Sequence, residues 1–173
     1  MAKASGNDMQ ANFAALEVDE SAAGTLTFKQ YAFPFSIQDK TAIIIHRIEY
    51  WPKGFGLIVD DSDYILGGLS TSKNISDPLD QSDPAIIDNM RWVNRKGGTP
   101  ANQEIYPMPY IKDLANLPGG GLMVAPSPLY AMVKSVTGSS ACGLWLKLFY
   151  TYKTLTTDQY WELVESRRII TSQ

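Results

Sequence analysis

The sequence predicts a mainly β protein, with about eight short strands in a sandwich or barrel and one short C-terminal α-helix. Aromatic residues make up 11% of the chain and include nine Tyr, and such side chains fit the half-buried surface of a sheet. Thirteen Gly and ten Pro, spread along 173 residues, interrupt the chain too often for long helices. Strand-like segments also follow one another without helical segments between them, which argues against a parallel α/β sheet.

Length and composition indicate a single globular domain. The chain is 45% hydrophobic and 19% charged, and 173 residues are enough to bury a core without disulfides or metals. We expect an N-terminal arm over residues 1–14, a β domain over residues 15–155, and a helix with a short tail over residues 156–173. All three segments are expected to belong to one domain.

The charge balance argues against direct nucleic-acid binding by the arm. The formal net charge is -3, and the first 23 residues contain one basic residue, Lys3. A genome-binding arm needs clusters of Lys and Arg to displace the counterions of phosphate. The N-terminus also lacks the apolar core of a signal peptide, and no stretch reaches the ~20 apolar residues that span a bilayer. We therefore expect a soluble protein without a transmembrane segment.

In the N-terminal half, alternating apolar and polar residues between positions 15 and 33 predict the first β segments. The clearest strand covers residues 40–51, KTAIIIHRIEYW, and Pro52 is expected to end it. Strict alternation places its side chains in two sets, Ala42, Ile44, His46, Ile48 and Tyr50 on one face, and Ile43, Ile45, Arg47, Glu49 and Trp51 on the other.

Shorter elements follow in the middle of the chain. Residues 57–59 and 64–71 are predicted strands, and the pair Gly67 and Gly68 indicates a bulge in the second. Residues 72–84 form a polar connection. The apolar spacing of residues 85–92 fits a strand and a short helix equally well, so both interpretations stay open.

The C-terminal half contains three predicted strands. They cover residues 122–125, 129–136 and 141–153, with a turn at residues 138–140 before the last and longest, ACGLWLKLFYTYK. The glycine-rich segment 117–121 lacks the Lys and Ser/Thr of a phosphate-binding loop and is interpreted as a flexible loop.

The C-terminal helix has a start signal in the sequence. Thr156 and Gln159 fit a capping box, and Leu155 and Tyr160 are placed as a hydrophobic staple. A helix over residues 157–168 then has acidic Asp158 in its first turn and two arginines in its last, which matches the helix dipole at both ends.

No catalytic constellation is visible, and we expect neither an enzyme nor a bound cofactor. His46 is the only histidine and Cys142 the only cysteine, which is too few for a mixed Cys/His zinc site. No G-x-S-x-G elbow accompanies the histidine. The favoured interpretations are a half-buried structural histidine and a small, buried cysteine.

Asp60, Asp61 and Asp63 are candidate calcium ligands, because calcium prefers carboxylate oxygens. Their spacing does not match an EF-hand loop, however, and Asp is also a common turn residue. Turn formation is therefore favoured over a metal site.

Aromatic side chains supply the candidate contact surface. The expected subunit contacts are Phe13, Trp51, Phe55, Tyr106, Tyr110 and Trp161. Exposed aromatic residues also suit a sugar-binding face, so a carbohydrate-binding β-sandwich is the alternative interpretation.

The order of elements resembles the single jelly-roll capsid proteins of small tailless icosahedral viruses. A polar arm precedes about eight short strands, the long strands lie near both ends, and the loops are rich in Pro and Gly. The resemblance covers about residues 15–155. It implies an antiparallel eight-stranded jelly-roll sandwich that self-assembles as a viral capsid subunit and is located in the virion.

Copies of the chain, with other capsid proteins, are the partners that this resemblance implies. The arm departs from many RNA-virus capsid proteins because it is not basic. That departure fits a shell around an internal membrane, a second capsid layer, or a genome condensed by another protein. A cupin-like enzyme is disfavoured, because the histidine-rich metal set of cupins is missing from a chain with one His.

Overall fold

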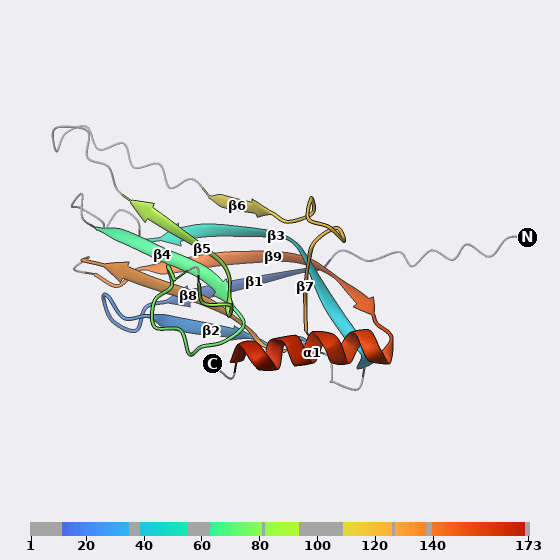
Figure 1. Cartoon of the computed structure of the whole chain (residues 1–173). Coiled ribbons are helices and arrows are strands. Elements are labelled where there is room, and N and C mark those ends of the chain that lie inside the picture. The colour runs from blue at the N-terminus through green and yellow to red at the C-terminus, as the bar shows by residue number, and fades with distance from the viewer. Residues whose placement is uncertain are drawn as a thin grey trace, which may run out of the picture.

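The computed structural model describes residues 12–34, 39–54, 63–80, 82–93, 109–125, 127–137 and 140–171, with side chains described as far as residue 165. Within these residues, nine strands form two antiparallel sheets, and one helix follows at the C-terminus (Figure 1). The prediction of a mainly β sandwich with a C-terminal helix is confirmed. The expected number of eight strands is wrong, since the described residues contain nine.

Each sheet combines strands that are distant in sequence. The five-stranded sheet has the order β1 (Asn12–Asp19), β9 (Gly143–Thr154), β3 (Thr41–Lys53) and β6 (Tyr110–Asp113), and β7 (Leu122–Val124) also pairs with β3. The four-stranded sheet has the order β2 (Thr27–Tyr31), β8 (Leu129–Val136), β4 (Tyr64–Ser70) and β5 (Ile86–Val93). The chain therefore crosses repeatedly from one sheet to the other.

The main core lies between the two sheets. The apolar residues of β3, β9, β4 and β8 meet there, because alternate side chains of each strand point to the same face. Its fully buried members include Ile43, Ile45, Ile48, Tyr50, Ile65, Leu69, Leu129, Val133, Leu144, Leu146 and Leu148.

A β-bulge in β3 overturns the predicted assignment of its faces. The register with β9 runs from Ile45, opposite Tyr150, directly to Arg47, opposite Phe149, so His46 is an extra residue. The extra residue reverses the alternation. Ile43 and Ile45 therefore share the core with Ile48 and Tyr50, which strict alternation had placed on the opposite face.

Pro52 does not end β3, contrary to the expectation. The strand continues to Lys53, with Pro52 opposite Leu144 of β9. Among the described residues, the pairing with β6 stops at Tyr50. A proline is compatible with a strand where its missing amide has no ladder partner.

The glycine pair of β4 is not a bulge, since Gly67 and Gly68 pair regularly with β5 and the irregularity follows between Leu69 and Ser70. The glycines instead permit close packing. A Cβ on Gly67 would lie 2.8 Å from the Trp92 ring, and one on Gly68 would lie 2.7 Å from the Asp88 carbonyl oxygen.

One further expectation is settled in the middle of the chain. The ambiguous segment 85–92 is a strand, β5. The short strand β6 was not predicted. The strand expected at 57–59 lies outside the described residues, as do two residues of the expected turn at 138–140.

Helix α1 (Thr157–Thr171) begins as predicted and ends three residues later than residue 168. The amide nitrogen of Gln159 lies 3.4 Å from Thr156 Oγ1, and that of Thr156 lies 3.3 Å from Gln159 Oε1, so the capping box is confirmed. Leu155 and Tyr160 share a small buried cluster with Ala42 of β3. The helix thus covers one end of the five-stranded sheet (Figure 1).

The four-stranded sheet is covered on its outer side by the connection between β4 and β5. Ile75 and Ala85 of this connection form a buried cluster with Met132 of β8 and are joined by Phe28 of β2. No helix among the described residues is long and apolar enough to cross a lipid bilayer.

Candidate functional site

The candidate site is the outer face of the five-stranded sheet, on the side away from the core. We call this surface the outer face. It consists of the outward side chains of four strands: Phe13, Ala15, Glu17 and Asp19 of β1, Trp145, Lys147 and Phe149 of β9, Arg47, Glu49, Trp51 and Lys53 of β3, and Ile111 and Asp113 of β6. Residues that lie opposite one another in neighbouring strands share a face, so the register places these side chains together.

Large apolar side chains of the outer face are exposed to solvent. Phe13 is 65% exposed, Ile111 and Trp145 are each 46% exposed, and Trp51 is 44% exposed. Trp51 and Trp145 lie directly opposite each other in the β3–β9 register. Exposed apolar groups in such a cluster are typical of an interaction surface.

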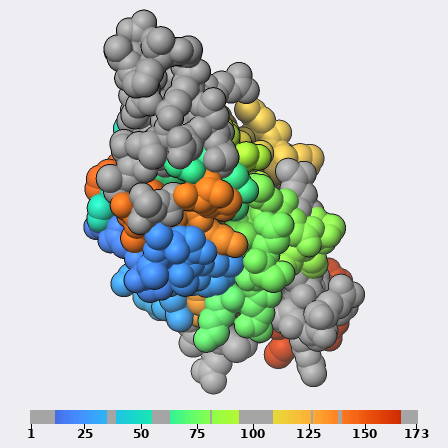
Figure 2. All heavy atoms as spheres, turned by 90° about the vertical axis from the view of Figure 1, so that its left-hand side faces the viewer, coloured from blue at the N-terminus to red at the C-terminus, as the bar shows by residue number. Residues whose placement is uncertain are grey.

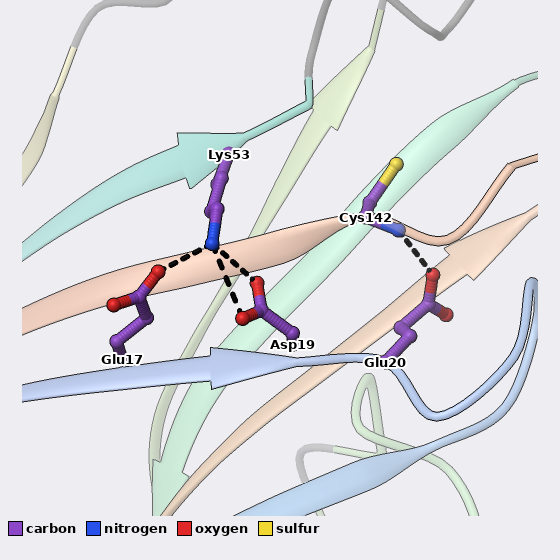
Figure 3. Close-up of polar contacts among 5 residues, drawn as sticks. All are labelled: Glu17, Asp19, Glu20, Lys53 and Cys142. Atoms are coloured by element: carbon purple, nitrogen blue, oxygen red, sulfur yellow. Dashed lines mark hydrogen bonds and ion pairs between the residues drawn. The ribbon is translucent and has the colours of Figure 1, made fainter.

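The charged side chains of the outer face pair with one another. Lys53 reaches from β3 across β9 and contacts both Glu17 and Asp19 of β1, with Nζ 2.9 Å from Asp19 Oδ1 (Figure 3). These two contacts raise the pKa of Lys53 above its ordinary value. Arg47 lies 2.6 Å from Glu49. Lys53 therefore bridges β3 and β1, whereas Arg47 and Glu49 pair within β3.

Cations also lie close to the aromatic rings. Lys147 Nζ is 5.7 Å from the ring centre of Phe13, and Lys53 Nζ is 5.6 Å from that of Trp145. Between these groups is a shallow hollow of about 470 Å³, to which Ala15, Glu17, Trp51, Trp145 and Lys147 contribute. Ala15 is the smallest of these side chains and leaves the space open. The hollow can accept one large side chain or a sugar ring.

A buried carboxylate joins the turn after β1 to β8 and to the start of β9. Glu20 is 6% exposed. Its side chain accepts hydrogen bonds from the Ser135 amide at 2.6 Å, the Ser135 hydroxyl at 2.7 Å and the Cys142 amide at 2.8 Å. Figure 2 shows the blue residues of the β1–β2 region against orange ones of the β8–β9 region. The hydrogen bonds of Glu20 therefore stabilise this end of the sandwich.

The Cys142 thiol is buried, as predicted. Burial, together with the negative charge of Glu20, raises the pKa of this thiol from 9.0 to about 11. A thiol of this kind is a poor nucleophile near neutral pH, because the thiolate is the reactive form.

His46 has hydrogen-bond partners at both ring nitrogens. Nδ1 lies 2.7 Å from the Gly120 carbonyl oxygen, and Nε2 lies 2.8 Å from Thr151 Oγ1. A carbonyl only accepts, so Nδ1 carries the proton and donates it to Gly120. The backbone at Gly121 lies so close to β3 that a Cβ atom on this residue would be 2.7 Å from the Ile45 carbonyl oxygen. His46 therefore attaches the glycine-rich loop to the bulge.

A polar cluster lies inside the sandwich near the edges formed by β5 and β6. Asp88 of β5 lies 3.6 Å from Lys112 of β6 and so links the two sheets. Burial raises the pKa of Asp88 despite the opposing effect of Lys112. Burial, and next the charge of Asp88, raises the pKa of Tyr50 well above 10.0. Tyr50 Oη, Asp88 Oδ2 and Trp92 Nε1 are all buried, and Tyr50 and Asp88 lie close enough to interact.

The residues predicted for the site are dispersed. Phe13 and Trp51 lie on the outer face, and Phe13 belongs to β1, which begins at Asn12, inside the predicted arm of residues 1–14. Tyr110 is half-buried, and its ring centre stacks 5.9 Å from that of Tyr50 on the core side. Trp161 is 52% exposed on α1 and does not belong to the outer face. Residues 1–11, Phe55 and Tyr106 lie outside the described residues.

The candidate calcium ligands are divided in the same way. Asp60 and Asp61 lie outside the described residues, whereas Asp63 is buried and accepts a 2.6 Å hydrogen bond from the Thr137 hydroxyl. In the part of the chain that the structure describes, no group of three His, Cys, Asp or Glu side chains is arranged to hold a metal ion.

Sequence reasoning missed Trp145, Ile111 and Glu20. Trp145 had a signal, because it alternates with Lys147 on the face of the last strand opposite the leucines. Ile111 and Glu20 had none, since β6 was not predicted and the partners of Glu20 are more than 100 residues distant.

No protein-family model matches this sequence, and no match was found among curated proteins.

Proposed function

We propose that this chain is a self-assembling structural protein, most specifically a jelly-roll subunit of a viral capsid. The observation that carries the proposal is the nesting of strand pairs. A jelly roll is a long antiparallel ribbon rolled into two sheets, so its first strand pairs with its last, its second with its second-last, and so on inward. When the short β7 is omitted, the described pairs β1–β9, β2–β8, β3–β6 and β4–β5 follow this rule.

The outer face supports an assembly role for this fold. Capsid subunits need side surfaces that are apolar enough to adhere and polar enough to remain in solution before assembly. The outer face combines exposed Phe13, Trp51 and Trp145 with ion pairs that are satisfied within one chain. Burying such a surface removes apolar area from water, at about 25 cal/mol per Å², while Arg47 and Lys53 keep the acidic partners that they have within the chain.

Electron microscopy and sedimentation of the purified full chain test the proposal. Closed particles of uniform size, or discrete oligomers that grow with protein concentration, are expected. A chain that stays monomeric at every concentration and salt condition would overturn the proposal. Limited proteolysis adds a second readout, because residues 1–11 should become protected in particles if the arm contacts a neighbouring subunit.

A carbohydrate-binding module is the second candidate, because jelly rolls also occur in lectins and because Trp51 and Trp145 flank the hollow. Stacking of a sugar ring on either indole would use the space over Ala15. Glycan-array binding that is lost in Trp51→Ala and kept in Trp161→Ala, by a protein that does not self-associate, would favour this candidate over assembly.

A further inference from the structure

The two sheets differ in how their outer sides are covered. The connection between β4 and β5 covers the four-stranded sheet at Met132, and α1 covers the five-stranded sheet at Ala42. At the other end of the five-stranded sheet, Phe13, Trp51 and Trp145 are all more than 40% exposed. This uncovered part of the outer face is available to a binding partner.

The charge of the outer face favours another protein surface over a polyanion. Four acidic groups stand beside three basic groups, and the strands divide them unevenly. Strand β1 carries two acids, β9 one base, β3 two bases and one acid, and β6 one acid. A nucleic acid or anionic membrane needs a clear excess of Lys and Arg, which this surface lacks.

Because the charges are divided unevenly among the strands, two copies of the outer face are complementary to each other in one relative orientation. If two copies stack face to face with their two-fold axis along β9, the acidic β1 of each copy lies over the basic β3 of the other. Asp19 then faces the end of β3 that holds Lys53, and Phe13 faces the end that holds Arg47. A two-fold axis perpendicular to the strands would instead place acidic β1 over acidic β1. Homo-oligomers commonly use such isologous contacts.

We propose that the outer face is a two-fold interface with a second copy of this chain, with the axis along β9. The proposal rests on the self-assembly proposed above and specifies the surface that one of its contacts uses. Trp145 lies on the axis strand, so the two Trp145 side chains meet near the axis. Each Trp51 stands over β1 of the other copy and enters the hollow above Ala15, where aromatic anchors in pockets contribute most to binding.

Charge reversal followed by mixing tests this interface. One variant carries Glu17→Lys with Asp19→Lys, and a second carries Arg47→Glu with Lys53→Glu. The four side chains are between 36% and 54% exposed, so the fold should tolerate the changes. Each variant alone brings like charges together, and its self-association should weaken by about tenfold or more. An equimolar mixture restores opposite charges on both sides of the axis and should recover the wild-type sedimentation profile.

Two further variants test the apolar part of the interface. Trp51→Ala removes the inserted side chain, and Ala15→Phe fills the hollow without removing any group. Both should reduce self-association, whereas Glu165→Ala, a change at an exposed residue of α1, should not. Circular dichroism and melting temperature of every variant establish that the fold is intact.

The outcomes separate this inference from the proposed function. A wild-type chain that never self-associates refutes both. If the wild type assembles and each charge variant, correctly folded, assembles as well as the wild type, only the two-fold interface is wrong. Loss of assembly that mixing does not restore also refutes the interface, because the charges then act elsewhere.

Discussion

Glu20 and Cys142 are joined in both directions: the Cys142 amide donates to the Glu20 carboxylate at 2.8 Å (Figure 3), and the Glu20 amide donates to the Cys142 carbonyl at 2.9 Å. The same carboxylate satisfies the Ser135 amide and hydroxyl. One acidic side chain therefore holds the turn after β1, strand β8 and the entry to β9 at one end of the sandwich.

Replacing this carboxylate should destabilise the protein strongly. Glu20→Ala leaves two buried backbone amides and one hydroxyl without acceptors, which should lower the free energy of unfolding by about 2 to 4 kcal/mol. Urea unfolding of the variant measures the change. Glu165→Ala is the matched control on the exposed side of α1 and should change stability by less than about 0.5 kcal/mol. Equal effects of the two substitutions would contradict the assigned role of Glu20.

The contacts of His46 predict coupling between His46 and Thr151. His46→Ala should lower the free energy of unfolding by about 1 to 2 kcal/mol, because it removes two hydrogen bonds. Thr151→Val removes only the bond to Nε2. In a double-mutant cycle the two changes should be non-additive by about 0.5 kcal/mol or more. Strict additivity would mean that the 2.8 Å contact contributes nothing.

The raised pKa of Asp88 predicts the sign of its contribution to the pH dependence of stability. Burial raises its folded pKa above the ordinary 3.8, so the native state holds this proton to higher pH than the unfolded chain does. The contribution of Asp88 to stability therefore falls as pH rises from the ordinary value through the raised pKa. Asp88→Asn cannot titrate, and should gain stability relative to wild type between acidic and neutral pH, as measured by urea unfolding at several pH values.

Asp80→Asn serves as the control of opposite sign. Hydrogen bonds from Ser82 lower the pKa of Asp80, so its contribution is present above the ordinary pKa and is lost as pH falls. This variant should lose stability relative to wild type toward neutral pH. The same slope for both variants would refute the assignment for Asp88.

Cys142 should react slowly with thiol reagents in the native protein. With a pKa of about 11, roughly one thiol in a thousand is ionised at pH 8, and the side chain is 4% exposed. Labelling with a chromogenic disulfide should therefore follow unfolding, and should become fast in denaturant. Glu20→Ala should speed native labelling, because it loosens the entry to β9. Rapid labelling of the folded wild type would contradict the burial of this thiol.

Much of the fold could be predicted from the sequence where the signal is local. The capping residues Thr156 and Gln159 positioned the start of α1, and alternation in residues 141–153 separated the buried leucines from Trp145 and Lys147. The bulge at His46 could not be predicted in this way. It depends on a partner at Thr151 and on the close approach of Gly121, both of which come from other strands or loops.

The candidate site, too, could be predicted from the sequence only in part. Trp51 and Phe13 were predicted as contact residues from their type, but their grouping with Trp145 on one surface depends on the register of β1, β9 and β3. Tyr110 was predicted as a contact residue in the same way, because it is also aromatic. It packs against Tyr50 because β6 presents that side chain to the core.

The sequence alone determined that the chain is mainly β, that its helix starts after Thr156, and that its single cysteine is buried. These properties follow from side-chain periodicity, capping chemistry and residue type, which act over a few neighbouring positions. The tertiary structure decided the nested strand order, the reversal of faces at His46 and the outer face. These depend on pairings between strands that are distant in the sequence, such as Phe13 opposite Phe149, and distant pairing leaves little trace in the sequence of either strand.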